Sequence, residues 1–241
     1  MQARIALRQF SVTYPNFTLV PLSVEFKPGE RVAFVGPNGS GKTTTLRALA
    51  GRLTEYEGAI LLDGRDLRGL LPLGRREIGS MPESLGGYGW MTVRDHLAFL
   101  RQFYPTWDAG YAAHLVDRLR IPLGDAIGRL SKGTRAKVSF VAAEAYRPSL
   151  LLLDEPTSGL DPEVRGELIG MILSSAVERP NRVVVFSTHL LEDVEQVAQR
   201  VLVLIDGKLT LDESVDHLRR SHSEMNLPKI LYAALGRAKS A

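Results

Sequence analysis

The 241-residue sequence contains no cysteine, and this absence excludes several kinds of protein. Without thiols the chain has no disulfide, no thiolate metal site and no catalytic cysteine. It also lacks any run of about 18 consecutive apolar residues, the length that a bilayer-spanning helix needs. The first residues, MQARIALRQFSV, alternate apolar with polar side chains and are typical of neither a signal peptide nor a membrane anchor. These absences indicate a cytoplasmic protein.

A strong excess of one charge is missing as well. The 30 Lys and Arg residues face 27 Asp and Glu residues, and the net charge is +3. The basic residues are dispersed and are not interleaved with aromatic residues, as they would be on a nucleic-acid-binding surface. We therefore expect no nucleic-acid partner. Apolar residues make up 44% of the chain, enough for a folded core.

Apolar patterns indicate an α/β fold with two kinds of strand. Ile5 and Leu7, and later Leu22, Val24 and Phe26, alternate with polar residues, which predicts an antiparallel β edge region. A short continuous apolar run at residues 31–35 predicts a strand covered on both faces. Further apolar runs predict strands at residues 59–62, 150–153, 183–186 and 201–205. Helical segments between several of these runs favour a mostly parallel sheet.

One stretch differs from this alternation of strands and helices. Residues 84–148 contain helix-like patterns, such as VRDHLAFLRQFY and AGYAAHLVDRLR, and no convincing strand. We interpret the chain as a single domain, residues 1–241, with an α-helical subdomain (84–148) inserted between two parts of the α/β core (1–83 and 149–211). Residues 212–241 are expected to form a short helical tail.

The strongest motif follows the apolar run at 31–35. Residues 36–43, GPNGSGKT, match G-x-x-x-x-G-K-[ST] and precede a helical segment, the context that a phosphate-binding loop (P-loop) requires. Glycines let backbone N–H groups turn towards phosphates, and the helix N-terminus adds positive potential. Lys42 is expected to reach the β- and γ-phosphates, and the Thr43 hydroxyl to bind Mg²⁺. The expected nucleotide contacts are Gly36, Asn38, Gly39, Ser40, Gly41, Lys42, Thr43 and Thr44.

Further candidates follow two other predicted strands. The run at 150–153 ends in Asp154 and Glu155. Asp154 is expected beside the metal ion, where P-loop enzymes keep an aspartate. Glu155 is placed to polarise an attacking water, which favours hydrolysis over transfer to a substrate hydroxyl. His189 follows the run at 183–186 and could hydrogen-bond a γ-phosphate at the carboxyl edge of the sheet, although taken alone it favours a structural role.

In this order the motifs resemble those of the ATP-binding subunits of ABC transporters, over nearly the whole chain. Walker A lies at 36–43, LSKGT (130–134) stands where the family usually has LSGGQ, Walker B lies at 150–155, SGLD at 158–161, and His189 matches the switch histidine. Two departures resemble the ABC-2 type exporter branch. Lys132 replaces the second glycine of LSGGQ, and Glu83, in EIGSMPE, stands where many members have glutamine. A carboxylate there can still ligate Mg²⁺ through water.

The resemblance implies a head-to-tail dimer around two ATP molecules, in which the signature loop of one subunit contacts the ATP held by the other. Ser131 and Gly133 would then contact the nucleotide of the opposite subunit, and Asp161 the opposite subunit itself. Tyr14 matches the aromatic residue that stacks on adenine. Phe17 is a weaker candidate for that role, and either residue could instead belong to the core.

The resemblance also implies a function. We expect an Mg²⁺-dependent ATPase, the motor of an exporter, that drives a transmembrane permease from the inner face of the cell membrane. Both halves of the shared site are intact, which favours a homodimer. Leu85, Tyr88 and Trp90 would contact the permease, or pack internally. The alternative is a soluble ABC-type ATPase of a cytosolic assembly, such as iron–sulfur scaffolding, which shares every motif.

Overall fold

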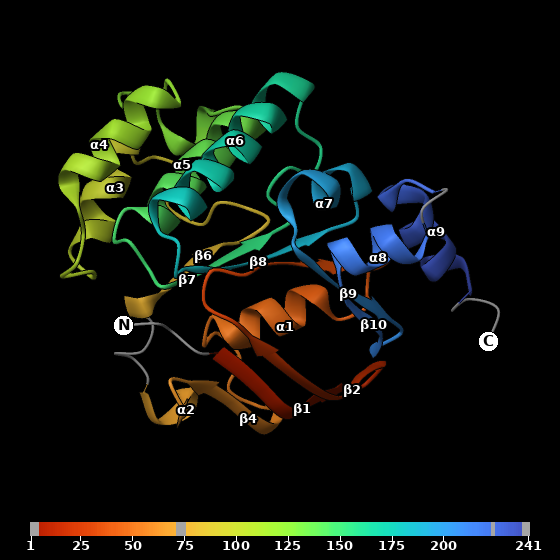
Figure 1. The fold of residues 1–241 in the computed structure, drawn as a ribbon. Helices are drawn as coiled ribbons and strands as arrows, with labels where there is room; N and C mark the ends of the chain where they lie inside the picture. The colour runs from red at the N-terminus through yellow and green to blue at the C-terminus, as the bar shows by residue number, and fades with distance from the viewer. Residues whose placement is uncertain (1–4, 71–75, 223–224, 238–241) are drawn as a thin grey trace.

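The computed structural model describes residues 5–70, 76–222 and 225–237, which form two β-sheets with helices between and above them (Figure 1). The larger sheet has the strand order β10-β9-β3-β8-β7-β6. From β9 to β6 all neighbouring strands are parallel, whereas β10 is antiparallel to β9. Its strands are β3 (Arg31–Val35), β6 (Ile78–Met81), β7 (Leu150–Asp154), β8 (Val183–Thr188), β9 (Arg200–Ile205) and β10 (Lys208–Ser214). The predicted α/β fold with a mostly parallel sheet is confirmed.

The smaller sheet is antiparallel, with the order β2-β1-β4-β5. It contains β1 (Ile5–Tyr14), β2 (Phe17–Phe26), β4 (Glu57–Leu62) and β5 (Arg65–Asp66). β1 and β2 form a hairpin from the pair Ile5–Phe26 to the pair Tyr14–Phe17. This sheet is the antiparallel region that the alternation of apolar and polar residues predicts.

Both faces of the larger sheet are buried in hydrophobic cores. Helix α1 (Lys42–Leu49) lies between the two sheets and fills one core (Figure 1). Consecutive residues of β7 point to opposite faces: Leu150 and Leu152 contact the core around α1, and Leu151 and Leu153 the core under the helices on the other side. Burial on both faces explains why this strand is a continuous apolar run.

Helices cover the face of the larger sheet that is opposite α1 (Figure 1). Residues 84–148 form α3 (Val93–Arg101), α4 (Ala109–Arg118), the 3₁₀ turn η2 (Ile127–Arg129) and α5 (Lys132–Glu144). Within this stretch the only β-pairing is an isolated bridge between Thr92 and Ala126. Next along the chain come α6 (Pro162–Glu178) and α7 (Leu191–Val197), while the short α2 (Leu67–Leu70) follows the smaller sheet. None of the helices in the described ranges is both long and apolar enough to cross a membrane.

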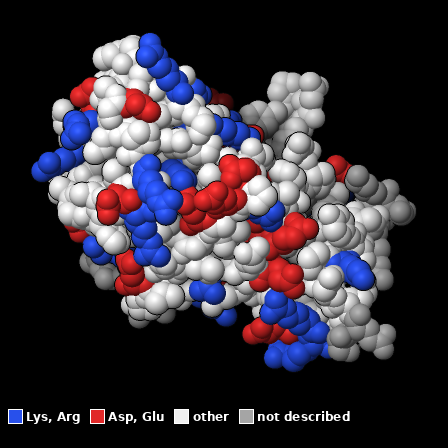
Figure 2. All heavy atoms as spheres, turned by 90° about the horizontal axis from the view of Figure 1, so that it is seen from above, with Lys and Arg blue, Asp and Glu red and all other residues white. Residues whose placement is uncertain are grey.

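Ion pairs join neighbouring helices on this side of the molecule. Figure 2 looks onto this side and shows Lys and Arg side chains interspersed with Asp and Glu. Lys137 of α5 pairs with Glu167 of α6, and Arg165 of α6 pairs with Asp193 of α7 at 2.6 Å. These two ion pairs link α5 to α6 and α6 to α7.

The C-terminal part differs from the expected helical tail. Residues 212–214 belong to β10, and helix begins only at Val215, with α8 (Val215–Ser221) and α9 (Leu227–Arg237). β10 lies at the sheet edge and alternates exposed with half-buried residues, so it lacks the apolar run of a central strand. Leu227, Ile230 and Leu231 bury α9 against the main core. Residues 1–4, 71–75, 223–224 and 238–241 lie outside the described residues.

Candidate functional site

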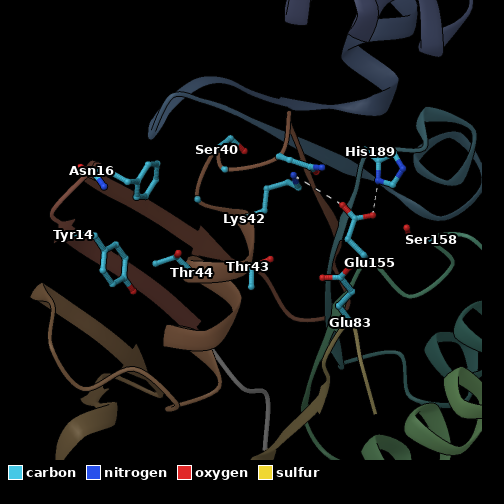
Figure 3. Close-up of a pocket in the computed structure, with 14 residues that line it drawn as sticks. Tyr14, Asn16, Ser40, Lys42, Thr43, Thr44, Glu83, Glu155, Ser158 and His189 are labelled. Atoms are coloured by element: carbon cyan, nitrogen blue, oxygen red, sulfur yellow. Dashed lines mark hydrogen bonds and ion pairs between the residues drawn. The ribbon is translucent and has the colours of Figure 1, made fainter. Parts of the chain in front are cut away.

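A cavity of about 570 Å³ lies beside the loop that joins β3 to α1, a size typical of ligand sites. Its walls come from the β1–β2 turn, the loop, and the carboxyl ends of the strands of the larger sheet (Figure 3). The lining residues are Tyr14, Asn16, Phe17, Asn38, Gly39, Ser40, Gly41, Lys42, Thr43, Thr44, Glu83, Glu155, Ser158 and His189. Of the predicted contacts in the loop, Gly36 alone is absent from this lining. Asn16 and Ser158 were not predicted, although Ser158 begins the SGLD motif.

The loop is held close to the smaller sheet. Gly41 precedes α1 with φ of +104°, and a Cβ there would come within 3.1 Å of the Phe17 ring and closer still to Leu19. Only glycine suits both demands. The buried Lys42 Nζ donates hydrogen bonds to the carbonyls of Gly36 (2.8 Å) and Pro37 (3.0 Å). Burial lowers the pKa of Lys42, although the negative charges of Glu155 and Asp154 oppose this shift.

Asp154 joins three segments at the edge of the sheet. It is the last residue of β7, and its Oδ1 accepts hydrogen bonds from Thr43 Oγ1 (3.1 Å) and from Ser187 Oγ (2.7 Å). The loop, β7 and β8 therefore meet at one carboxylate oxygen. The sequence reasoning gave no role to Ser187. The clue in the sequence was that Ser187 lies two residues before His189, directly after an apolar run.

Glu155 spans the cavity between a lysine and a histidine. Its Oε2 forms a 2.8 Å hydrogen bond with His189 Nδ1, and its Oε1 lies 4.0 Å from Lys42 Nζ (Figure 3). The backbone of Glu155 has φ of +48°, a left-handed conformation that is uncommon for residues other than glycine. Such strain persists only when surrounding contacts enforce it. Glu83 lies at the same side of the cavity, after β6 (Figure 3).

Two aromatic residues stand at the far end of the cavity. Tyr14 and Phe17 flank the β1–β2 turn, with ring centroids 6.4 Å apart and planes inclined by 29°. Tyr14 is 41% exposed, so the alternative that it is a core residue is wrong. Phe17 is half-buried and packs against the core around α1.

Five predicted residues lie outside the cavity lining: Gly36 and Asp154, and also Ser131, Gly133 and Asp161. Ser131 Oγ caps α5 by accepting a hydrogen bond from the Thr134 N–H (3.1 Å), and Asp161 Oδ1 caps α6 in the same way. Gly133 lies against Val164 of α6, because a Cβ on it would be 3.1 Å from that side chain. The N-termini of α5 and α6 are therefore neighbours. Lys132 reaches over the SGLD loop, within 2.6 Å of where a Cβ on Gly159 would lie.

A second, smaller cavity of about 340 Å³ lies between β6 and the helices α3 and α5. Tyr88 lies at its rim and stacks on Trp90. The two side chains are 57% and 74% exposed, so the alternative of internal packing is wrong for both. Leu85 is partly buried against the core. His96 lines this cavity. It is 4% exposed, and neither ring nitrogen has a hydrogen-bond partner.

A P-loop whose threonine hydroxyl bonds to a strand-end aspartate, at the carboxyl edge of a mostly parallel sheet, defines a P-loop nucleoside triphosphatase. The ABC transporter family model matches residues 19–158, and the chain belongs to this family. It is thus an ATPase and the ATP-binding subunit of a transporter, and the predicted fold class and family are confirmed.

Two curated relatives and one solved structure illustrate the similarity. ABC transporter ATP-binding protein YtrB of Bacillus subtilis is 34% identical over 92% of this chain and 76% of its own length. The putative 2-aminoethylphosphonate import ATP-binding protein PhnT of Salmonella typhimurium is 32% identical over 85% of this chain, which spans 57% of that relative. A structure of the ATP-binding subunit of an ABC transporter matches with a TM-score of 0.83 at 26% identity, over 95% of this chain and 98% of that one.

Proposed function

We propose that the larger cavity binds ATP with Mg²⁺, and that hydrolysis there drives a membrane permease. The observation that carries this proposal is the 3.1 Å hydrogen bond between Thr43 and Asp154, two residues 111 positions apart in the chain. It brings the P-loop hydroxyl and the strand-end carboxylate to one point beside the cavity. These are the two protein ligands that P-loop enzymes use for the metal of a metal–nucleotide complex.

The P-loop and the aromatic pair of Tyr14 and Phe17 would contact opposite ends of the nucleotide. Backbone N–H groups at the start of α1 face the phosphates, and no side chain caps this helix N-terminus. Lys42 exchanges its two carbonyl acceptors for β- and γ-phosphate oxygens, which form stronger, charge-assisted hydrogen bonds. The exposed ring of Tyr14 stacks on adenine at the other end of the cavity.

The oxygen donors of the site fit Mg²⁺. Thr43 and Asp154 supply a hydroxyl and a carboxylate, and Glu83 adds a carboxylate at the cavity wall. Mg²⁺ usually takes one or two carboxylates and fills its other positions with water and substrate phosphates. In the described part of the chain, no three acidic, histidine or cysteine side chains gather into a metal site of their own. The site therefore fits a metal ion that binds together with the nucleotide and would neutralise phosphate charge.

Glu155 is the candidate for activating water. As a carboxylate it accepts a hydrogen bond from the attacking water and orients it towards the γ-phosphate. His189 holds one carboxylate oxygen at 2.8 Å, so the other is free to face the cavity. Lys42 draws that second oxygen only weakly, at 4.0 Å. When the γ-phosphate takes the lysine, Glu155 keeps its orientation through His189.

The residues outside the cavity support a dimer of two identical chains. Ser131 is exposed at the N-terminus of α5, next to the N-terminus of α6, where it meets no nucleotide of its own chain. A hydroxyl together with two helix N-termini attracts an anion. A nucleotide on a second copy would supply that anion to Ser131 and Gly133, and Asp161 would face the same interface.

The permease is expected at the aromatic rim of the smaller cavity. Tyr88 and Trp90 form an exposed stacked pair, and aromatic residues are enriched in protein interfaces. Binding there would hold the chain at the inner face of the cell membrane. Export is the direction that Glu83 and Lys132 favour, through their resemblance to the ABC-2 type branch.

Replacing Glu155 by glutamine tests this function. Glu155→Gln should lose ATP turnover by a factor of about 10² or more, the range for loss of a general base, and should keep ATP binding. The exposed Glu55→Gln is the matched control and should hydrolyse ATP at the wild-type rate. Light scattering should show an ATP-dependent dimer of Glu155→Gln that Ser131→Arg prevents. Wild-type turnover in Glu155→Gln would remove Glu155 from the mechanism.

The partner is tested with the same variant. Tagged Glu155→Gln, purified from native cells in detergent with ATP and Mg²⁺, should recover a polytopic membrane protein identified by mass spectrometry. Adding Trp90→Ala should reduce that recovery while leaving the ATP dimer intact. Recovery of soluble partners alone would contradict the permease and favour a cytosolic assembly.

A further inference from the structure

Ser187 bridges the two carboxylate residues of the site. It is the penultimate residue of β8 and is fully buried. Its Oγ lies 2.7 Å from Asp154 Oδ1 and accepts a 2.9 Å hydrogen bond from the Glu155 backbone N–H. A hydroxyl has one proton and two lone pairs, so it donates to the carboxylate and accepts from the amide at the same time.

Strand pairing fixes this bridge. β7 and β8 are parallel neighbours, and Ser187 is paired with Asp154 in their register. Ser187 lies near the end of β8 and His189 directly after the strand, and both residues contact Glu155. The end of β8 therefore contacts Glu155 twice, through its backbone N–H at Ser187 and through its carboxylate at His189.

The two hydrogen bonds restrain different parts of the site. On one side, Asp154 Oδ1 is held between the hydroxyls of Ser187 and Thr43. On the other side, the Ser187 hydroxyl accepts a hydrogen bond from the Glu155 N–H. This bond stabilises the left-handed backbone conformation of Glu155, with φ of +48°. Strained residues at functional sites need such surrounding contacts to persist. Without the hydroxyl, the Glu155 amide would lose this partner in a mostly buried place.

We propose that Ser187 is a positioning residue for ATP hydrolysis. Its hydroxyl orients the Asp154 carboxylate for the metal ion and holds the Glu155 backbone so that the carboxylate faces the nucleotide. This inference rests on the proposed function, because it assumes Mg²⁺–ATP in the larger cavity. A purely structural serine would stabilise the fold without changing metal dependence.

The chain offers a matched control for a structural serine. Ser175 of α6 is also buried, donates a 2.8 Å hydrogen bond to a carboxylate (Glu144) and accepts one from an N–H donor (Arg182). None of these three residues lines the larger cavity. Ser175→Ala therefore removes the same kind of bridge away from the site.

The test compares Ser187→Ala with Ser175→Ala. Binding of a non-hydrolysable ATP analogue is titrated against Mg²⁺, alongside kcat, KM and Tm. Ser187→Ala should raise the half-saturating Mg²⁺ concentration roughly tenfold, the lower end of the cost of losing a hydrogen bond to a charged group. It should lower kcat by at least about tenfold by the same reasoning, with a smaller change in KM. Ser175→Ala should lower Tm and leave the Mg²⁺ dependence and kcat unchanged. Ser187→Cys keeps a side chain that can form hydrogen bonds, although a larger one that bonds more weakly, and it serves if Ser187→Ala does not fold.

Two outcomes separate the failure of this inference from that of the proposed function. If the Ser187 variants lower Tm but retain wild-type Mg²⁺ dependence and kcat, Ser187 is structural only and the inference is overturned. Asp154→Asn, measured in parallel, tests the metal site itself. If Asp154→Asn also binds the analogue with unchanged Mg²⁺ dependence, the assignment of the metal to this cavity fails, and the role of Ser187 fails with it.

Discussion

Replacing Arg182 by methionine should destabilise the protein more than most other single changes. Arg182 precedes β8 and is almost completely buried, as is Glu144 at the end of α5. Arg182 Nη1 donates to both carboxylate oxygens of Glu144, at 2.6 and 2.8 Å, and Nε donates to the Pro148 carbonyl at 3.0 Å. The substitution would leave the Glu144 carboxylate buried with Ser175 as its remaining hydrogen-bond donor.

The expected loss follows from the burial of both partners. Removing one member of a buried ion pair typically costs about 3–5 kcal/mol, because the remaining charge stays uncompensated. Each kcal/mol shifts Tm by about 2–4 °C in a protein of this size. Tm should therefore fall by roughly 6–20 °C. The exposed ion pair between Arg8 and Glu25, at 3.4 Å, is the comparison: Arg8→Met should cost about 1 kcal/mol or less.

Urea unfolding followed by circular dichroism measures both losses. A second variant, Arg182→Met with Glu144→Leu, replaces the ion pair by apolar side chains and should recover most of the lost stability, since such replacements are often neutral. The reasoning would be refuted if Arg182→Met cost no more than Arg8→Met. It would also be refuted if the double variant were no more stable than Arg182→Met alone.

Two further predictions concern the helices above the sheet. Burial in the folded chain lowers the pKa of His96 from its ordinary value of about 6.5. At pH values below about 6.5, His96 therefore binds a proton in the unfolded chain but not in the folded chain. The free energy of unfolding should therefore fall between pH 7.5 and 5.5, by at most about 1.4 kcal/mol per pH unit, and His96→Leu should flatten this part of the profile measured by urea titration. Gly79→Ala should lower the free energy of unfolding by about 1–3 kcal/mol, because the added Cβ would lie 2.5 Å from the Ala143 carbonyl oxygen. Gly170 of α6 has open space around it, so Gly170→Ala should raise the free energy of unfolding by about 0.5–1 kcal/mol. Equal melting temperatures for the two glycine variants would contradict the close packing inferred at Gly79.

The sequence predicts those parts of the fold that depend on local pattern. The continuous apolar runs of β3, β7, β8 and β9 mark strands covered on both faces, and all four lie in the parallel part of the larger sheet. The strand β6 was missed, because its four residues include Gly79 and Ser80 and show neither an apolar run nor alternation. Its place in the sheet depends on the absence of a Cβ at Gly79, where α5 comes close, and a single sequence does not reveal that contact.

The candidate site likewise has residues that the sequence predicts and contacts that it does not. The loop residues and Glu155 were predicted from motifs, because each motif is contiguous in the chain, and the structure places them around one cavity. The contact of Ser187 with Asp154 was not predicted, since it depends on the register between two strands. The burial of His96 was not predicted for a similar reason, because the groups around it in space come from β6, α5 and the loop at Gly87.

The arrangement of the helix N-termini fits the proposed dimer, in which one chain would not complete its own site. Ser131 and Asp161 already accept hydrogen bonds from the first turns of their own helices, at 3.1 and 3.0 Å. A side chain that caps a helix leaves further N–H groups of that first turn unpaired. At α1 the corresponding N–H groups face the cavity, whereas those of α5 and α6 lie outside its lining. In the dimer proposed above, a nucleotide held by a second copy would supply an anion to this second pair of helix N-termini. Hydrolysis at one site would then depend on contacts from both subunits.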